Sequence, residues 1–252
     1  MRRNYRGISI NTSKNTHETV FEMIREDTSK TVADIPSGSG AFIQRLKDEQ
    51  FEHVIAIDIE NILEIEHNNF VQADMTKTLP MPNQSCDTLV CIDGIEHISQ
   101  QYEFVREANR VLSESGELII STPNISSIRS RWKWFWTGHH HKCNAPLDEY
   151  NPGPLHHIGM ISFHDVRYLL HTNGFRITEI RTNRIKPVSW LYALFVPFVY
   201  PATWWVYTKR GKKEGTSELN RTVFKQMFTK AILFGETMIV KAVKLNAVNG
   251  GV

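Results

Sequence analysis

A short apolar segment that runs into a glycine turn is the feature that most restricts the fold of this chain. Residues 32–34 read as a buried strand, residues 36–40 as a tight turn, and the apolar positions that follow as one face of a helix. A second apolar strand, residues 54–58, ends on Asp58. The order strand, glycine turn, helix, strand and terminal carboxylate predicts a βαβ unit that binds a nucleoside.

The residues of this turn bear on which nucleoside is bound. A diphosphate site favours the pattern Gly-x-Gly-x-x-Gly, but here Gly38 and Gly40 are followed by Ile43 at the third position. Asp34, at the end of the first strand, would repel a diphosphate and attract a cofactor with a cationic amino-acid end. S-adenosylmethionine carries a sulfonium, an ammonium and no phosphate. We therefore expect this cofactor, with Asp58 accepting hydrogen bonds from its ribose hydroxyls, and keep a dinucleotide oxidoreductase as a weaker alternative.

Two further strands are expected to end in residues of the same pocket. Residues 71–73 read as a third strand that leads to Asp74, which can accept a hydrogen bond from an adenine amino group while Met75 covers the ring. Residues 88–92 predict a fourth strand that runs into Asp93-Gly94-Ile95-Glu96-His97. The remaining expected elements are a helix over 101–112 and strands over 117–122, 176–180 and 236–243.

This series of motifs resembles the class I S-adenosylmethionine-dependent methyltransferases, and within them the small-molecule group that includes quinone-biosynthesis and sugar or lipid-linked-sugar methyltransferases. The matching residues lie within 31–124, with weaker similarity through residues 157–175. They are Asp34 to Gly40, Asp58, Asp74, Glu96-His97, Asn109 to Leu112 with Gly116, and Ser121 to Asn124.

The resemblance implies a Rossmann-like, doubly wound α/β fold whose mostly parallel seven-stranded sheet has an antiparallel last strand. The predicted cofactor-binding set is Asp34, Ser37, Gly38, Gly40, Asp58, Ile59, Asp74, Met75, Asp93 and Gly94. The chain departs from the family at Pro36-Ser37, where Gly-Cys is usual, and proline removes one backbone donor. This departure supports the alternative of a catalytically silent cofactor-binding or scaffold protein.

The composition indicates which partners and which cellular compartment to expect. Lys and Arg number 29 against 27 Asp and Glu, so a strong field that would attract nucleic acid is not expected. Three cysteines, and a basic N-terminus that no apolar run follows, predict a reducing, cytoplasmic setting. We expect a single methyltransferase domain over 1–252. Its expected parts are a helical cover (1–30), a cofactor-binding core with acceptor loop (31–183), an aromatic and basic insertion (184–234), and a final strand and tail (235–252).

The insertion contains twenty consecutive uncharged residues, 188–207, followed by a cluster of Lys and Arg at 209–213. About twenty apolar residues span a bilayer core, but Pro197 and Pro201 are expected to break a spanning helix. Peripheral membrane contact through 188–213 at the inner membrane face, a buried or dimerising helix pair, and a transmembrane helix all remain open. A second aromatic and basic run, 129–136, is interpreted as an acceptor lid or a second membrane-facing edge.

Methyl transfer to a hydroxyl calls for a base, for which histidine is suited at neutral pH. His97 follows the fourth strand, at the edge where ligands of parallel sheets gather, and His156 and His157 lie in the expected acceptor loop. The alternative for Glu96 and His97 is to cap the helix that begins near Ser99. No metal is expected, because the adjacent His139, His140 and His141 point apart in an extended loop.

The sequence thus predicts methyl transfer from S-adenosylmethionine to a small or lipid-linked acceptor at oxygen, of the surface-polysaccharide, glycolipid or quinone type. It leaves the oligomeric state open.

Overall fold

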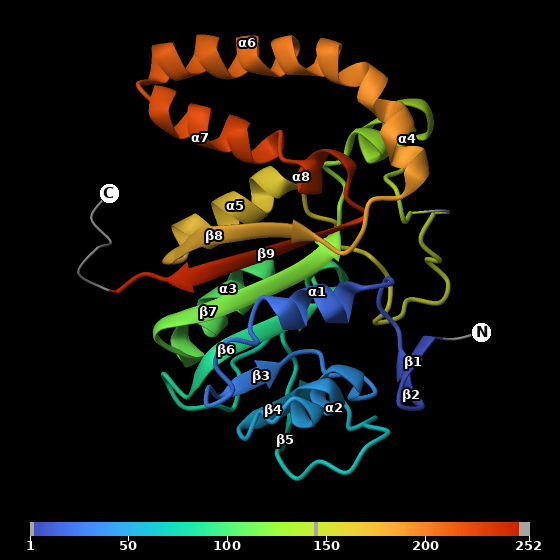
Figure 1. Cartoon of the computed structure of the whole chain (residues 1–252), viewed down its shortest axis with the longest axis vertical. Helices are drawn as coiled ribbons and strands as arrows, with labels where there is room; N and C mark the ends of the chain where they lie inside the picture. Colours follow the sequence, from blue (N-terminus) through green and yellow to red (C-terminus); the bar gives the residue numbers. More distant parts are fainter. Residues whose placement is uncertain (1–2, 144–145, 247–252) are drawn as a thin grey trace.

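One seven-stranded sheet organises the molecule, in the order β5-β4-β3-β6-β7-β9-β8 (Figure 1). The structure is a computed structural model that describes residues 3–143 and 146–246. The strands are β3 (Val32–Asp34), β4 (Val54–Asp58), β5 (Phe70–Gln72), β6 (Cys86–Ile92), β7 (Leu112–Pro123), β8 (Phe175–Thr182) and β9 (Thr237–Lys244). Strands β3 to β7 pair in parallel, and β9 runs antiparallel to both β7 and β8. The predicted fold class, including the antiparallel last strand, is confirmed.

The strand order places the ligand edge. The chain winds outward from β3 through β4 to β5, then returns to add β6 and β7 on the other side of β3. The carboxyl ends of β3, β4 and β6 therefore meet at the point where the winding direction reverses, and parallel sheets bind their ligands there. All the predicted cofactor residues lie at or just beyond these strand ends or that of β5.

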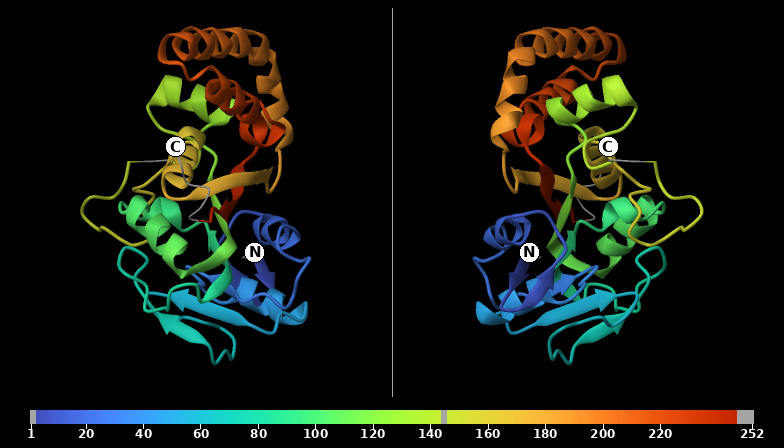
Figure 2. Two further views of the ribbon diagram at one scale, coloured as in Figure 1. Left: turned by 90° about the vertical axis from the view of Figure 1, so that its left-hand side faces the viewer. Right: turned by 90° about the vertical axis from the view of Figure 1, so that its right-hand side faces the viewer.

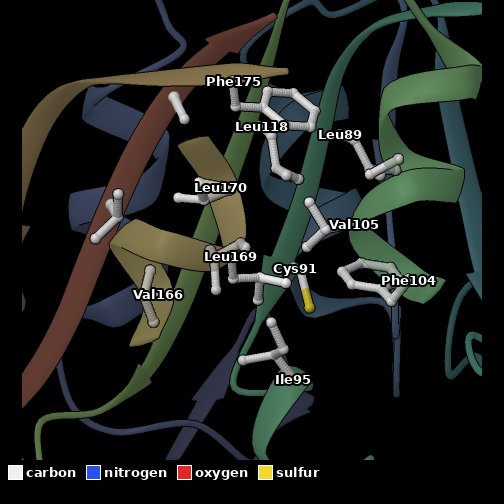
Figure 3. Close-up of a cluster of buried hydrophobic side chains, with 14 of the residues drawn as sticks. Leu89, Cys91, Ile95, Phe104, Val105, Leu118, Val166, Leu169, Leu170 and Phe175 are labelled. Atoms are coloured by element: carbon white, nitrogen blue, oxygen red, sulfur yellow. The ribbon is translucent and has the colours of Figure 1, made fainter. Parts of the chain in front are cut away.

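Helices cover both faces of the sheet, as a doubly wound fold requires. On one face α3 (Gln101–Val111) and α5 (Phe163–Thr172) pack around Phe104, Leu118 and Leu169 (Figure 3). On the other face α1 (Thr16–Glu22) and α2 (Ala41–Asp48) pack through Val20 and Phe42. Central strands are apolar in both directions because successive side chains point to opposite faces. In β6, accordingly, Leu89 and Cys91 join the first cluster, and Val90 and Ile92 join the second.

The N-terminal segment contains a hairpin that the sequence analysis did not anticipate. Strands β1 (Arg3–Tyr5) and β2 (Ile8–Ile10) form a separate antiparallel pair ahead of α1. The hydroxyl of Tyr5 donates to Asp48 Oδ2 at 2.8 Å, and the backbone N–H of Ser9 donates to Glu64 Oε2 at 2.9 Å. These bonds hold the hairpin against α2 and the loop that follows β4.

The segment between β8 and β9 is helical. It comprises η2 (Pro187–Phe195), α6 (Val196–Glu214), α7 (Ser217–Met227) and α8 (Lys230–Phe234). Figure 2 shows α6 lying along the outer side of α7, at the end of the molecule remote from β5. Within the described residues, every helix is too short or too polar to cross a bilayer.

The expectation that proline would interrupt this helix is wrong, since α6 continues through Pro201. Pro197 lies in the first turn of α6, where a missing N–H costs no intrahelical bond. Pro201 leaves the carbonyl of Pro197 without its usual donor, but both residues are exposed, so water can solvate that carbonyl.

The polar side chain of Asn124 fastens this helical segment to the end of β7. Asn124 is buried, and its Nδ2 donates to the carbonyls of Ala231, Ile232 and Gly235 at 3.1, 2.9 and 3.1 Å. Its Oδ1 accepts the N–H of Ser126 at 3.1 Å. The last carbonyls of a helix lack intrahelical donors, so Asn124 satisfies the end of α8 directly. The position of α8 is thereby set relative to the ligand edge.

Candidate active site

The turn between β3 and α2 leaves room in front of the sheet. Gly38 and Gly40 have φ values of 51° and 84°, a conformation that glycine adopts without cost. A Cβ built on Gly40 would lie 2.9 Å from Leu63 Cδ2, whereas one built on Gly38 would have no described atom within 4 Å. A side chain at Gly38 would therefore enter open space at the ligand edge.

Asp58 is fixed at the mouth of this turn. Its Oδ2 accepts the backbone N–H of Gly38 and its Oδ1 accepts that of Ile59, both at 2.8 Å. A carboxylate oxygen can accept more than one hydrogen bond, so each oxygen keeps a lone pair. Asp58, partly buried at the end of β4, is thus oriented to accept two hydroxyls of a ribose placed over the turn.

Asp34 is a buried carboxylate that pairs with no cation among the described residues. It is 2% exposed, and its Oδ1 has no hydrogen-bond partner among the described residues. Burial, and to a smaller extent the charge of Asp58, raises the pKa of Asp34 well above its ordinary value. Removing a carboxylate from water is costly unless a cation or donor compensates it. A ligand with positive charge would supply that compensation, and this is the chemistry of S-adenosylmethionine and not of a diphosphate.

The exit of β5 adds Asp74 to the same edge. The N–H of Ala73 donates to the carbonyl of Asp58 at 2.8 Å, which holds the two strand ends together. Asp74 Oδ1 accepts both the side-chain and backbone donors of Thr76, which lower the pKa of Asp74. The second oxygen lies 3.4 Å from Lys77 Nζ on the partly exposed side. Asp74 is therefore ionised and keeps acceptor capacity on one oxygen.

Pro36, the departure from the family pattern, packs against the end of β6. A Cβ on Gly94 would lie 2.4 Å from Pro36 Cδ and 3.1 Å from Cys91 Sγ, so only glycine allows this approach. The next donor, the N–H of Ser37, is used within the sheet by the carbonyl of Ile57 at 2.9 Å. The hydroxyl of Ser37 is buried, without a partner among the described residues. Within the turn, the Ser37 hydroxyl is therefore the first hydrogen-bond donor that remains available to a ligand.

Asp93 marks the boundary between the cofactor side and the acceptor side. Its φ of 47° is unusual for a residue with a side chain. The hydroxyl of Ser121 donates to its Oδ1 at 2.7 Å, and its own N–H donates to the carbonyl of Ser121 at 3.1 Å. Burial raises the pKa of Asp93. Strained backbone of this kind gathers at functional sites, and here Ser121 at the end of β7 holds it.

Two predicted catalytic histidines come together just beyond Asp93. The ring centroids of His97 and His157 are 4.8 Å apart, and His97 Nδ1 lies 3.2 Å from the carbonyl oxygen of His156. Donation from Nδ1 to this carbonyl leaves Nε2 as an acceptor. His156 thus joins the group through its backbone, and no bond from its ring is seen in the described part of the chain. Burial lowers the pKa of His97 and of His157, which keeps both rings neutral at neutral pH.

Glu96 completes this group, although it was not in the predicted site. It is buried in the 3-10 helix η1 (Ile95–His97), and burial together with the charge of Asp93 raises its pKa to about 8. Among the described residues, Glu96 makes no hydrogen bond to α3, and the side chain of the N-cap residue Gln100 makes no capping bond either. One ligand atom each from Glu96, His97 and His157 lie within 4.8 Å of one another.

Two imidazoles and a carboxylate are also a donor set for a divalent metal. Binding a metal here would displace the proton that Glu96 holds at neutral pH. The run His139-His140-His141 lies elsewhere, after helix α4 (Ile128–Thr137). There His140 Nδ1 lies 3.2 Å from the hydroxyl of Ser130, a residue of α4.

A cluster of cations around Glu236 borders the acceptor side. Glu236 is buried and pairs with Arg184, with Lys186 at 2.8 Å and with Lys142 at 3.3 Å. Lys142 also donates to the hydroxyl of Ser13 at 2.8 Å. These residues come from four distant parts of the chain, so no local sequence pattern could have identified them.

We expect Glu236→Gln to destabilise the protein by about 2 kcal/mol at pH 7. Burial acts to raise the pKa of Glu236, but the hydrogen bonds of Arg184 and Lys186 and the charge of Lys142 outweigh it and lower the pKa to about 2, against an ordinary value of 4.5. Because the pKa of Glu236 is lower in the folded state than in the unfolded state, its ionised form stabilises the folded protein at pH values above 4.5. That stabilisation is lost as the pH falls from 4.5 towards 2. Urea unfolding at several pH values should show the wild-type advantage shrinking over this range. An exposed control, Glu52→Gln, should be neutral, and a pH-independent difference for Glu236→Gln would contradict the assignment.

Comparisons with known proteins agree with this geometry. Residues 33–120 match the family described as the methyltransferase domain. A Mycobacterium tuberculosis protein named a probable S-adenosylmethionine-dependent methyltransferase is 48% identical over 54 residues, which are 21% of this chain and 19% of that relative. The aligned part thus spans about a fifth of the relative's length.

Solved structures match over nearly the whole chain. An S-adenosylmethionine-dependent methyltransferase from Archaeoglobus fulgidus has a TM-score of 0.54 at 17% identity, covering 91% of this chain and 95% of the other. One from Mesorhizobium loti has a TM-score of 0.54 at 12% identity, covering 90% and 96%. At these identities the likeness shows the fold alone. The sequence match over 33–120 includes the carboxyl ends of β3, β4, β5 and β6, where the predicted cofactor-binding residues lie.

Proposed function

We propose that this chain, which carries the methyltransferase domain of the class I S-adenosylmethionine-dependent methyltransferases, methylates a hydroxyl oxygen of a small or lipid-linked acceptor. The observation that supports this most directly is the pair of carboxylates at the glycine turn. Asp58 is oriented for a ribose, and buried Asp34 has no cation beside it in the part of the chain that the structure describes, so the cofactor would bring one. The acceptor and the atom methylated belong to the proposal, because the matched part of the curated relative is short.

In this proposal, residues on one side of Asp93 bind the cofactor and residues on the other side bind the acceptor. When bound, S-adenosylmethionine supplies a methyl carbon activated by the sulfonium. Asp58 would hold its ribose and Asp34 would face its cationic end. On the other side, His97 Nε2 would accept the proton of the acceptor's hydroxyl, which frees that oxygen to take the methyl group. Most of the rate enhancement comes from holding both partners at reacting distance in a site from which water is excluded.

The acceptor is proposed to be of the surface-polysaccharide, glycolipid or quinone type, met at the cytoplasmic face of a membrane. The cations Lys142, Arg184 and Lys186, three against one carboxylate, would favour an acceptor that carries negative charge. Trp134 on α4 stacks on His140, in the loop that carries Lys142, and this aromatic face suits a sugar or quinone ring.

Mass spectrometry with an isotopically labelled methyl donor tests this function. The protein is incubated with a total lipid extract and, separately, with the water-soluble fraction of a lysate, both containing the labelled cofactor. We expect one product to gain a labelled methyl group with wild type and not with Asp58→Ala. Calorimetry with the cofactor on the same samples distinguishes the alternatives: tight binding without any labelled product would support a silent cofactor-binding protein, and absence of binding would support a scaffold.

A further inference from the structure

We propose that η2, α4 and the outer side of α6 form one apolar surface, here called the docking face, that binds the headgroup region of an anionic lipid bilayer. The proposal deepens the proposed function by stating where the acceptor is met. Docking itself requires neither cofactor nor turnover, so the two can be tested apart.

The docking face begins on the 3-10 helix. Side chains three residues apart are aligned in such a helix, and in η2 the aligned set is Val188, Leu191 and Leu194, the last two being 67% and 75% exposed. The stripe continues onto α6 with Phe198, which is 74% exposed, and with Trp205, two helical turns further along. Large apolar side chains are therefore exposed on both of these consecutive helices.

Helix α4 widens this face. The rings of Trp132 on α4 and Phe195 on η2 stack with centroids 4.6 Å apart. Phe135 and Trp136, on the next turn of α4, are 68% and 66% exposed. Helix α4 and η2 are in contact, and Figure 1 shows α4 beside the orange η2 segment. Contiguous exposed apolar surface of this kind marks an interaction site.

The orientation of α6 is set by contacts on its opposite side. Tyr200 packs edge-to-face on Phe224 and Phe228 of the α7 region, with centroids 5.0 and 4.9 Å apart, and Tyr207 also contacts Phe224. With these tyrosines committed to α7, α6 cannot rotate to bury Phe198 and Trp205 without breaking its own packing. The docking face is consequently the side left without a partner within the described residues.

The charges on and around the docking face favour an anionic lipid surface as its partner. Residues 187–213 and 128–137 contain no Asp or Glu. Lys209 Nζ lies 4.6 Å from the ring centre of Trp205, at the border of the apolar stripe. Aromatic rings beside lysines suit the bilayer interface, where rings enter the headgroup layer and lysines meet anionic lipid. Two copies pairing through this face would bring like charges together, which disfavours a dimer.

The docking face adjoins the acceptor side of the site. Helix α4 begins directly after the Asn124 turn at the end of β7, and Lys133 on α4 donates to the carbonyls of His140 and Cys143 at 3.2 and 2.7 Å. The same loop carries Lys142, whose charge acts on His157 after the larger effects of burial and His97. A molecule resting on lipid through this face would therefore hold its acceptor side close to the membrane surface.

Vesicle flotation tests the proposal, with the full chain and no cofactor. Wild type should float with phosphatidylcholine–phosphatidylglycerol vesicles. The triple variant Leu194→Gln, Phe198→Gln and Trp205→Gln should bind about 100-fold more weakly. A matched variant with three exposed changes elsewhere, Ile62→Gln, Tyr102→Gln and Tyr168→Gln, should float like wild type. Lys209→Gln should weaken binding about fivefold on these vesicles and not on pure phosphatidylcholine.

Circular dichroism melting checks that each variant is folded. Wild type that stays in the bottom fraction with anionic vesicles would overturn the proposal, as would a triple variant that floats normally. So would sedimentation showing a wild-type dimer that the triple variant abolishes, since the face would then bind a second copy. A protein that floats as expected but yields no labelled methyl product would contradict the proposed function alone.

Discussion

Asp58→Ala should weaken the binding of S-adenosylmethionine at least about 100-fold. Each hydrogen bond to a charged acceptor contributes about 1.5–3 kcal/mol, and two such bonds from the ribose correspond to about 3 kcal/mol or more, a factor of at least about 100. The substitution also releases the backbone donors of Gly38 and Ile59, which Asp58 holds at 2.8 Å. Isothermal titration calorimetry with the cofactor and with S-adenosylhomocysteine measures the loss directly.

The matched control is Glu60→Ala, which removes an exposed carboxylate two residues away. It should bind both ligands like wild type. Asp58→Asn, which keeps one carbonyl acceptor, should fall between the two. An Asp58→Ala protein that melts like wild type and binds the cofactor with unchanged affinity would show that the ribose does not lie at the tip of β4.

His97→Ala should lower the rate of methyl transfer by about 100-fold to 10,000-fold, the usual contribution of a general base, and leave cofactor affinity unchanged. The reason is geometric: Nδ1 is taken by the carbonyl of His156 at 3.2 Å, so Nε2 is the nitrogen available to the acceptor. Single-turnover measurement with labelled cofactor and the acceptor found by mass spectrometry separates the chemical step from binding.

Two further variants sharpen this test. His53→Ala, at an exposed site at the start of β4, should have the wild-type rate. His156→Ala removes a ring but keeps the carbonyl that orients His97, and should cost much less than His97→Ala. Equal losses for His97→Ala and His156→Ala, or full activity of His97→Ala, would contradict the role given to His97.

The positions of the glycine turn and of Asp58 at the sheet edge could be predicted because their determinants are local. Gly38 must follow a strand directly to make the turn, and Asp58 must end the next strand of the same βαβ unit, so a few dozen consecutive residues specify both positions. Local contacts also make the helix faces of α2 and α3 readable from apolar spacing. The antiparallel last strand followed from the family resemblance and not from its own residues.

The acceptor half could not be predicted in the same way. Glu96 stood in the motif beside His97, but its burial and raised pKa depend on Asp93 and on packing that no spacing encodes. Lys142 and Glu236 are brought together only by the return of β9 into the sheet. The prediction that Pro201 would break the helix was wrong because helix propensity applies to an isolated helix. In the folded protein, packing of Tyr200 and Tyr207 on α7 stabilises α6 on both sides of Pro201.

By itself the sequence determined the doubly wound core and the glycine turn with its two carboxylates, since short-range patterns of apolar side chains, glycine and charge suffice for both. The tertiary structure alone decided which residues meet at the acceptor side and which aromatic side chains remain outside. Those outcomes depend on contacts between segments far apart in the chain. Burial in those contacts lowers the pKa of His97 and raises that of Glu96, whereas the cations around Glu236 outweigh its burial and lower its pKa.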